Sequence, residues 1–163
     1  MGKTPEYVME RTFNAPRDMV WRTWTDRELL GRWYGPGVET EIHELDVKPG
    51  GRWLNEMKMQ HGSFYERFEY LEVEAPSRLV WIQSNTDAEW NTAPPMMENW
   101  PKTLKAVVTF EADGDKTNMR FVWSPHEASD IECATFEGAM AGLGKGWGSG
   151  MAIIDEILAE LQA

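Results

Sequence analysis

Few residues in this sequence have the type and spacing that chemistry requires. The three histidines, His43, His61 and His126, follow neither the HExxH pattern nor another spacing typical of a metal site. The single cysteine, Cys133, cannot close a disulfide within the chain, and it excludes a zinc site built from cysteines of this chain alone. We therefore expect surface histidines, no metal site and no cofactor.

Two glutamates, Glu56 and Glu66, are candidates for acid–base chemistry because they lie on predicted strands that flank a hairpin. If one of them faced an apolar interior, burial would raise its pKa and suit it to general acid or base catalysis. The chain is rich in carboxylates, so the favoured interpretation is a solvated outer face for both. The sequence has no nucleophile elbow and no phosphate-binding glycine motif. No catalytic residue is therefore assigned, and a non-enzymatic role is favoured.

Length and charge exclude several classes of protein. With 163 residues the chain has the size of one domain, which we assign to residues 1–163. A net charge of −11 repels phosphate backbones, so nucleic acid is not an expected partner. No run approaches the roughly 18 apolar residues of a membrane-spanning helix, so membrane insertion is not expected. Residues Met1 to Glu6 lack a signal-peptide pattern, which predicts a cytoplasmic protein.

The chain is unusually rich in large, adaptable apolar side chains. It contains nine tryptophans and ten methionines. Tryptophan packs well beside a cavity or interface that leaves its N–H a partner, and methionine fills irregular space. This composition favours an apolar interior with room for a ligand over a core that is filled throughout.

The middle of the sequence has the period of a β-sheet. Apolar and polar residues alternate in seven predicted strands, at 7–13, 38–47, 52–59, 64–73, 79–84, 104–110 and 117–123. Most connections are short turns that contain glycine or proline, as at Pro49-Gly50-Gly51. Such turns are too short for helical crossovers, so the sheet must be largely antiparallel.

Two short helices are predicted between the first two strands. Pro16 suits the first turn of a helix, and the stripe that ends at Trp24 has helical spacing. The sequence from Thr25 to Glu28 matches a capping box, which predicts Thr25 as the N-cap of the second helix.

Helical spacing returns at the end of the chain. A short helix is predicted at 130–140, followed by an amphipathic helix of about 20 residues and roughly 30 Å. Glycines crowd the first half of this second helix, at 142, 144, 146, 148 and 150. Each glycine costs a helix roughly 1 kcal/mol relative to alanine. Either a close approach to the sheet or space for a ligand would explain them.

The segment 85–102 interrupts the strand pattern. It carries two tryptophans, Trp90 and Trp100, with prolines and the methionines Met96 and Met97. Loops of this length are often lids or binding elements. A lid and a variable hairpin extension are equally favoured.

Several ordered motifs resemble the activator of Hsp90 ATPase homologue-like family, within the START/Bet v 1-like, or helix-grip, superfamily. The matching residues, in chain order, are Arg11–Pro16, Val20-Trp21, Trp24-Thr25, Leu29, Trp33, Gly35-Pro36, Asp46–Arg52, Pro76 with Arg78-Leu79-Val80, Val107–Phe110 and Gly146-Trp147. The resemblance covers nearly the whole chain. One departure is Phe68, where relatives often have glycine, and an aromatic ring there would narrow a cavity.

The resemblance implies an α+β helix-grip fold, in which a curved seven-stranded antiparallel sheet holds a long C-terminal helix on its concave face. It implies binding of a small hydrophobic ligand in a cavity between sheet and helix. Two alternatives stay open. One is a chaperone-linked (Hsp90) interaction protein, less favoured because the founding activators carry an additional N-terminal domain for their main chaperone contact. The other is a cyclase- or hydrolase-like enzyme acting on an aromatic or polyketide-like substrate. A homodimer also stays open.

Strand alternation and the apolar face of the last helix predict which side chains line the cavity. The predicted lining residues are Trp24, Trp33, Trp53, Met57, Phe64, Trp81, Phe121, Trp123, Trp147 and Met151.

Overall fold

The computed structural model describes residues 4–95 and 97–163. The first three residues of the N-terminal stretch, and Met96 of the segment 85–102, lie outside the described residues. Seven strands form one antiparallel sheet in the order β1-β7-β6-β5-β4-β3-β2. The strands are β1 (Tyr7–Phe13), β2 (Glu39–Leu45), β3 (Arg52–Met59), β4 (Gly62–Glu74), β5 (Arg78–Thr86), β6 (Thr103–Asp113) and β7 (Lys116–His126).

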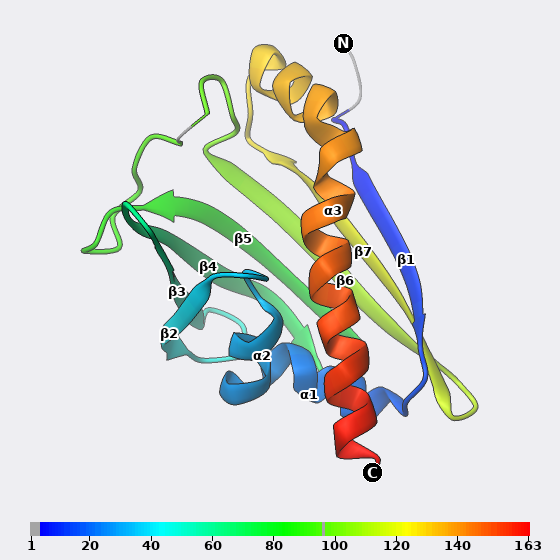
Figure 1. The fold of residues 1–163 in the computed structure, drawn as a ribbon. Coiled ribbons are helices and arrows are strands. Elements are labelled where there is room, and N and C mark those ends of the chain that lie inside the picture. The colour runs from blue at the N-terminus through cyan, green and yellow to red at the C-terminus, as the bar shows by residue number, and fades with distance from the viewer. Residues whose placement is uncertain (1–3, 96) are drawn as a thin grey trace.

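Three helices cover the concave face of this sheet. The short helices α1 (Arg17–Thr25) and α2 (Arg27–Trp33) follow β1, and the long helix α3 (Asp130–Leu161) ends the chain. Figure 1 shows α3 running along the sheet, with α1 and α2 beside its C-terminal half. The predicted α+β helix-grip architecture is confirmed. No helix in the described part of the chain is both long and apolar enough to cross a membrane.

The predicted N-cap of the second helix was wrong by one residue. Asp26, not Thr25, has the extended backbone of an N-cap, and its side chain accepts a hydrogen bond from the Leu29 amide. Thr25 is the last residue of α1, and its hydroxyl donates to the Trp21 carbonyl. Because the first helix continues through Thr25, its side chain is not free to cap the next one.

The C-terminal region forms one helix, where the sequence predicted two. Helix α3 has 32 residues and begins at a capping box between Ser129 and Glu132. At 1.5 Å per residue it is about 48 Å long. Its first turns lie at an angle to the rest (Figure 1), at the place where the break was predicted. The glycines therefore do not end the helix, and packing of the apolar side chains of α3 in the core compensates for their low helix propensity.

Most strands match their predicted bounds within two or three residues. Strand β7 continues to His126 and passes through Pro125, beyond the predicted end at Trp123. Its partner β1 pairs only as far as Trp123, so the last residues of β7 lie at an open edge. Proline is tolerated at such an edge because no ladder bond is lost there.

Aromatic side chains fill the end of the sheet that α1 and α2 cover. The ring of Trp24 lies 4.6 Å from that of Trp33 and 5.8 Å from that of Phe110, between centroids. The C-terminal half of α3 adds Ile154 and Leu158, both at most 2% exposed. We call this region the packed end.

Candidate functional site

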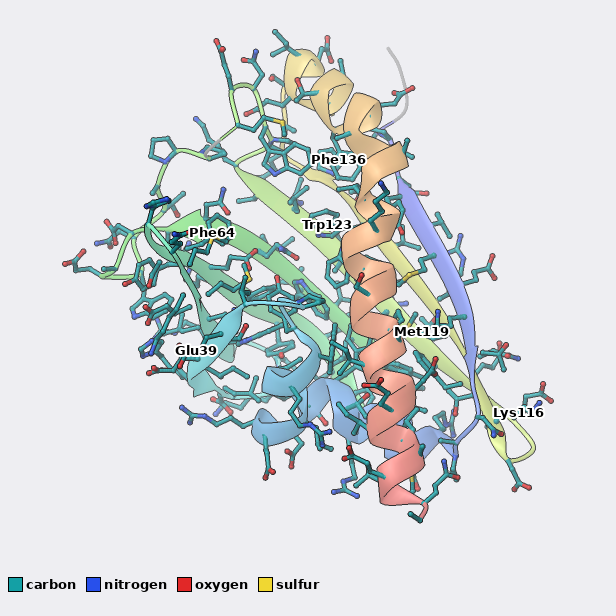
Figure 2. All side chains as sticks on the ribbon, viewed as in Figure 1. Glu39, Phe64, Lys116, Met119, Trp123 and Phe136 are labelled. Atoms are coloured by element: carbon teal, nitrogen blue, oxygen red, sulfur yellow. The ribbon has the colours of Figure 1, made fainter. Side chains whose placement is uncertain are left out.

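The opposite end of the concave face is not filled. Two neighbouring hollows, each of about 300 Å³, lie there. The helix-side hollow is bounded by the end of α2, the sheet and residues 142–150 of α3, and the lid-side hollow by the sheet and the segment 85–102. Glu66, Gln83 and Trp123 line both of them, so these three residues mark the junction. Figure 2 shows Trp123 beside the N-terminal half of α3, with Phe64 farther across the sheet.

Glycines on α3 provide the space. Gly142, Gly146 and Gly150 are four residues apart, so they lie on one helix face, and all three line the helix-side hollow. A Cβ atom at Gly142 or Gly146 would have no heavy atom within 4 Å. A Cβ atom at Gly150 would lie 3.0 Å from the ring of Trp33. Both predicted reasons for the glycines therefore occur, at different positions of one stripe.

The polar centre of the site is Glu66, whose predicted outer position was wrong. It alternates along β4 with Phe64 and Phe68 and points to the concave side, where it is only 6% exposed. The Tyr34 hydroxyl donates to Glu66 Oε1 at 2.8 Å, and Gln83 Nε2 donates to Oε2 at 3.2 Å. The less favoured interpretation from the sequence, a glutamate inside an apolar cavity, is the one that the structure adopts.

The orientation of Gln83 is fixed from its other side. The indole N–H groups of Trp81 and Trp123 both donate to Gln83 Oε1, each at 3.0 Å. Two donors require the amide oxygen on their side, so the NH₂ group must face Glu66. Two tryptophans therefore hold a hydrogen-bond donor against the buried carboxylate.

Burial dominates the acid–base properties of this network. Loss of solvation raises the pKa of Glu66 to about 7, although the hydrogen bonds from Tyr34 and Gln83 favour the ionised form and limit the rise. Burial also raises the pKa of Tyr34, and the neighbouring carboxylate raises it further. Among the ion pairs of the described residues, none includes Glu66. This carboxylate consequently has hydrogen-bond donors but no cation from those residues.

The second candidate glutamate, Glu56, lies on the outer face as predicted. It accepts a hydrogen bond from Ser63, and His43 Nε2 lies 2.8 Å from its Oε1. These bonds, that of Ser63 foremost, lower the pKa of Glu56. Glu41 completes a group with carboxylate and imidazole atoms within 4.8 Å of one another, and Lys58 Nζ lies 2.8 Å from Glu41. Because Lys58 pairs with one of its carboxylates, this group has the character of a surface ion-pair network.

The predicted lining residues divide equally between the hollows and the core. Those that line a hollow are Trp33, Met57, Phe64, Trp123 and Trp147. Those that lie at most 2% exposed in the core, without lining either hollow, are Trp24, Trp53, Trp81, Phe121 and Met151. Alternation along a strand identifies the residues of the concave face. It does not show which end of that face contains the hollows. Phe68, predicted to narrow the cavity, is buried and stacks on Trp53 with 3.8 Å between ring centroids.

Sequence reasoning did not assign Tyr34 or Gln83 to the site. Gln83 lies two residues after Trp81 on the same strand, so both side chains are on one face of the sheet, and this spacing could have identified Gln83. Tyr34 follows the last residue of α2, where no periodicity applies.

The segment 85–102 contributes to the lid-side hollow through Met97, Trp100, Pro101 and Lys102. The ring centroid of Trp100 lies 6.3 Å from that of Trp123. Earlier in the segment, Arg67 donates to the carbonyl of Trp90 at 2.7 Å. The segment is thus attached at two places, and its second half forms a wall of the hollow.

Comparison with known proteins agrees with this architecture. A family model described as activator of Hsp90 ATPase homolog 1-like protein matches residues 14–159. A crystal structure of a Mycobacterium smegmatis protein superimposes with a TM-score of 0.78 and 22% identity, covering 95% of this chain and 91% of that one. A solution structure from Arthrobacter aurescens gives a TM-score of 0.78 and 24% identity, covering 95% and 86%. A Nitrosomonas europaea crystal structure gives a TM-score of 0.70 and 22% identity, covering 96% of each chain. No match is found among curated proteins.

Proposed function

The chain belongs to the activator of Hsp90 ATPase homolog 1-like family, and from that premise we propose that it binds a small, mainly hydrophobic molecule between the sheet and α3. The proposal is carried by one observation. Glycines occupy three of the five α3 positions that line the helix-side hollow, whereas α3 places large aliphatic residues such as Ile154 and Leu158 in the packed end. Ligand sites are typically concave, apolar and aromatic, with a few polar groups, and the two hollows have this character.

A matched pair of helix variants tests this proposal. Gly146→Leu places a side chain into the helix-side hollow, whereas Gly138→Leu changes a glycine of the same helix that lines neither hollow. Both substitutions favour helix formation. Titration of neutral lipophilic compounds, followed by tryptophan fluorescence and calorimetry, should show at least tenfold weaker binding for Gly146→Leu and less than a twofold change for Gly138→Leu. Equal affinity in both variants would contradict binding at this place.

A second candidate function, catalysis, is favoured by a specific observation. The inward acid–base pair that an enzyme would need has a counterpart in Glu66 and Tyr34, 2.8 Å apart at the wall of the helix-side hollow. A carboxyl group with a pKa near neutrality suits general acid–base catalysis. Hydrolysis of aryl esters should then follow the ionisation of Glu66, with a midpoint near pH 7, and should be lost in Glu66→Gln. Turnover that is unchanged in Glu66→Gln would remove this candidate.

The remaining predictions rest on weaker support. A chaperone-linked role is supported by the family name alone. Binding to Hsp90 and stimulation of its ATPase would test it. The cytoplasmic location, the single domain and a homodimer stay predictions, which fractionation, limited proteolysis and sedimentation would test.

A further inference from the structure

The junction of the two hollows contains a charge for which the described residues provide no counter-ion. Glu66 has its two hydrogen-bond donors from Tyr34 and Gln83, but each carboxylate oxygen can accept a second bond. Because a buried anion is costly without a cation, this arrangement is suited to a ligand that supplies one.

Aromatic faces surround the same place. Tyr34, Trp33, Trp123 and Trp147 all line the helix-side hollow together with Glu66. The ring centroid of Trp147 lies 6.2 Å from that of Tyr34 and 5.6 Å from that of Trp123. These rings are inclined to one another by 67° and 74°, so they form separate walls and not one stack. Aromatic walls attract organic cations through the negative faces of their rings.

We infer that the ligand of the proposed site is a lipophilic amine, whose ammonium group binds Glu66 between Tyr34, Trp123 and Trp147 while its apolar part occupies the hollows. This inference rests on the proposed binding function and adds the class of the ligand. A buried ion pair is favourable when hydrogen bonds satisfy the remaining lone pairs of the carboxylate. Tyr34 and Gln83 each donate one such bond to Glu66, which leaves the other lone pairs for the ammonium group. A carboxylate or phosphate ligand would instead face the charge of Glu66 directly.

Among the described residues, one other charged side chain lines the two hollows, and it is not paired with Glu66. Lys102 lines the lid-side hollow, but it is exposed and forms no ion pair with a described residue. Tyr34 is the titratable group in direct contact with Glu66, and its raised pKa keeps it neutral. The protein as a whole has a net charge of −11, which concentrates cations at its surface.

Three probes of equal chain length separate the contributions of charge and apolar surface. Calorimetry at pH 8 would compare octylamine, octanol and octanoate with the intact protein. We expect octylamine to bind at least tenfold more tightly than octanol, and octanoate to bind most weakly. If octanol binds as tightly as octylamine, the amine inference is overturned and the binding function stands. If none of the three binds, both are overturned.

Two substitutions with the same change in net charge locate the effect. Glu66→Gln should weaken octylamine binding at least tenfold and alter octanol binding by less than threefold. The control, Glu69→Gln, removes a carboxylate on the same strand whose side chain is 52% exposed, and it should change neither. Equal losses in both variants would mean that the amine responds only to overall charge, which would overturn the inference.

Tyr34→Phe gives an independent test if Glu66→Gln does not fold. Removal of this hydroxyl removes a hydrogen bond that favours the ionised carboxylate, so the pKa of Glu66 should rise further. Octylamine affinity in the unaltered protein should increase with pH through about 7, as Glu66 ionises. In Tyr34→Phe the midpoint of that increase should move to higher pH by at least half a unit. An unchanged midpoint would overturn the role of Glu66.

Discussion

The two ends of the concave face are built from the same sheet and the same helix, yet large aromatic and aliphatic side chains fill one, and the other contains two mainly apolar hollows. At the packed end, Ile154 and Leu158 of α3 belong to the same buried cluster as Trp24 of α1 and Trp33 of α2. At the hollow end, Gly142 and Gly146 take the corresponding helix positions, and of the two short helices it is the end of α2, at Trp33, that reaches the hollow. The comparison indicates that close packing and open space are assigned to different parts of one helix.

The largest expected effect is a loss of stability that is confined to the packed end. Ile154→Ala should lower the free energy of unfolding by about 2–5 kcal/mol, because Ile154 is fully buried and its removal leaves a cavity. Leu143→Ala, in the hollow end of the same helix, should cost about 1 kcal/mol or less, since Leu143 is only partly buried. Urea denaturation measures both values. Similar losses in the two variants would show that the hollow end is as closely packed as the other.

The next largest effect is the pH dependence of stability that the buried carboxyl group of Glu66 causes. The pKa of Glu66 is raised to about 7 from an ordinary 4.5, so between these values the folded protein binds the proton that the unfolded chain releases. Stability contributed by this group is therefore fully present below pH 4.5 and is lost as the pH rises through 7. The loss should reach up to about 3 kcal/mol.

Glu66→Gln is the measurement that isolates this contribution. The difference in unfolding free energy between the two proteins should shift in favour of the variant from pH 5 to pH 8. Comparison between the two proteins cancels the opposite acid-side effects of Glu41 and Glu56, whose pKa values are lowered. Parallel pH profiles would mean that Glu66 is solvated in the folded state.

The smallest expected effect is a change in stability whose sign differs between two glycines of α3, Gly146 and Gly150. Gly146→Ala should stabilise the protein by up to about 1 kcal/mol, because the new methyl group meets nothing and the helix gains propensity. Gly150→Ala should destabilise it by about 1 kcal/mol, since its methyl group would press on the ring of Trp33. That ring cannot move freely, because its N–H donates to the Thr23 carbonyl. Thermal unfolding should separate the two variants, and a gain at both positions would show that Gly150 is not a close contact.

The sequence predicted the fold better than the site because the two depend on different information. Alternation along a strand is local, so it placed Phe64, Trp81 and Trp123 on one face without any knowledge of the partner strands. Whether a residue on that face meets a filled or an empty space depends on distant segments. Trp81 is covered by Trp24 from α1, whereas Trp123 is next to glycines of α3.

Glu66 shows the same division for a polar residue. The alternation of residues along the strand places Glu66 on the same face as Phe64 and Phe68. A charged residue is usually exposed, however, and this general preference favoured the outer face, which was wrong. Its donors come from Tyr34 and Gln83, respectively 32 and 17 residues away in the chain. No local pattern reports such a contact.

By itself the sequence determined the α+β class, the seven antiparallel strands and the terminal amphipathic helix, because periodicity and turn chemistry act over a few neighbouring residues. Tertiary structure alone decided that the last helix is continuous, that Glu66 faces inward and that the two apolar hollows lie at one end of the concave face. These features depend on contacts between side chains that are distant in the sequence. The residue pattern of a short segment does not show which distant side chains it will contact.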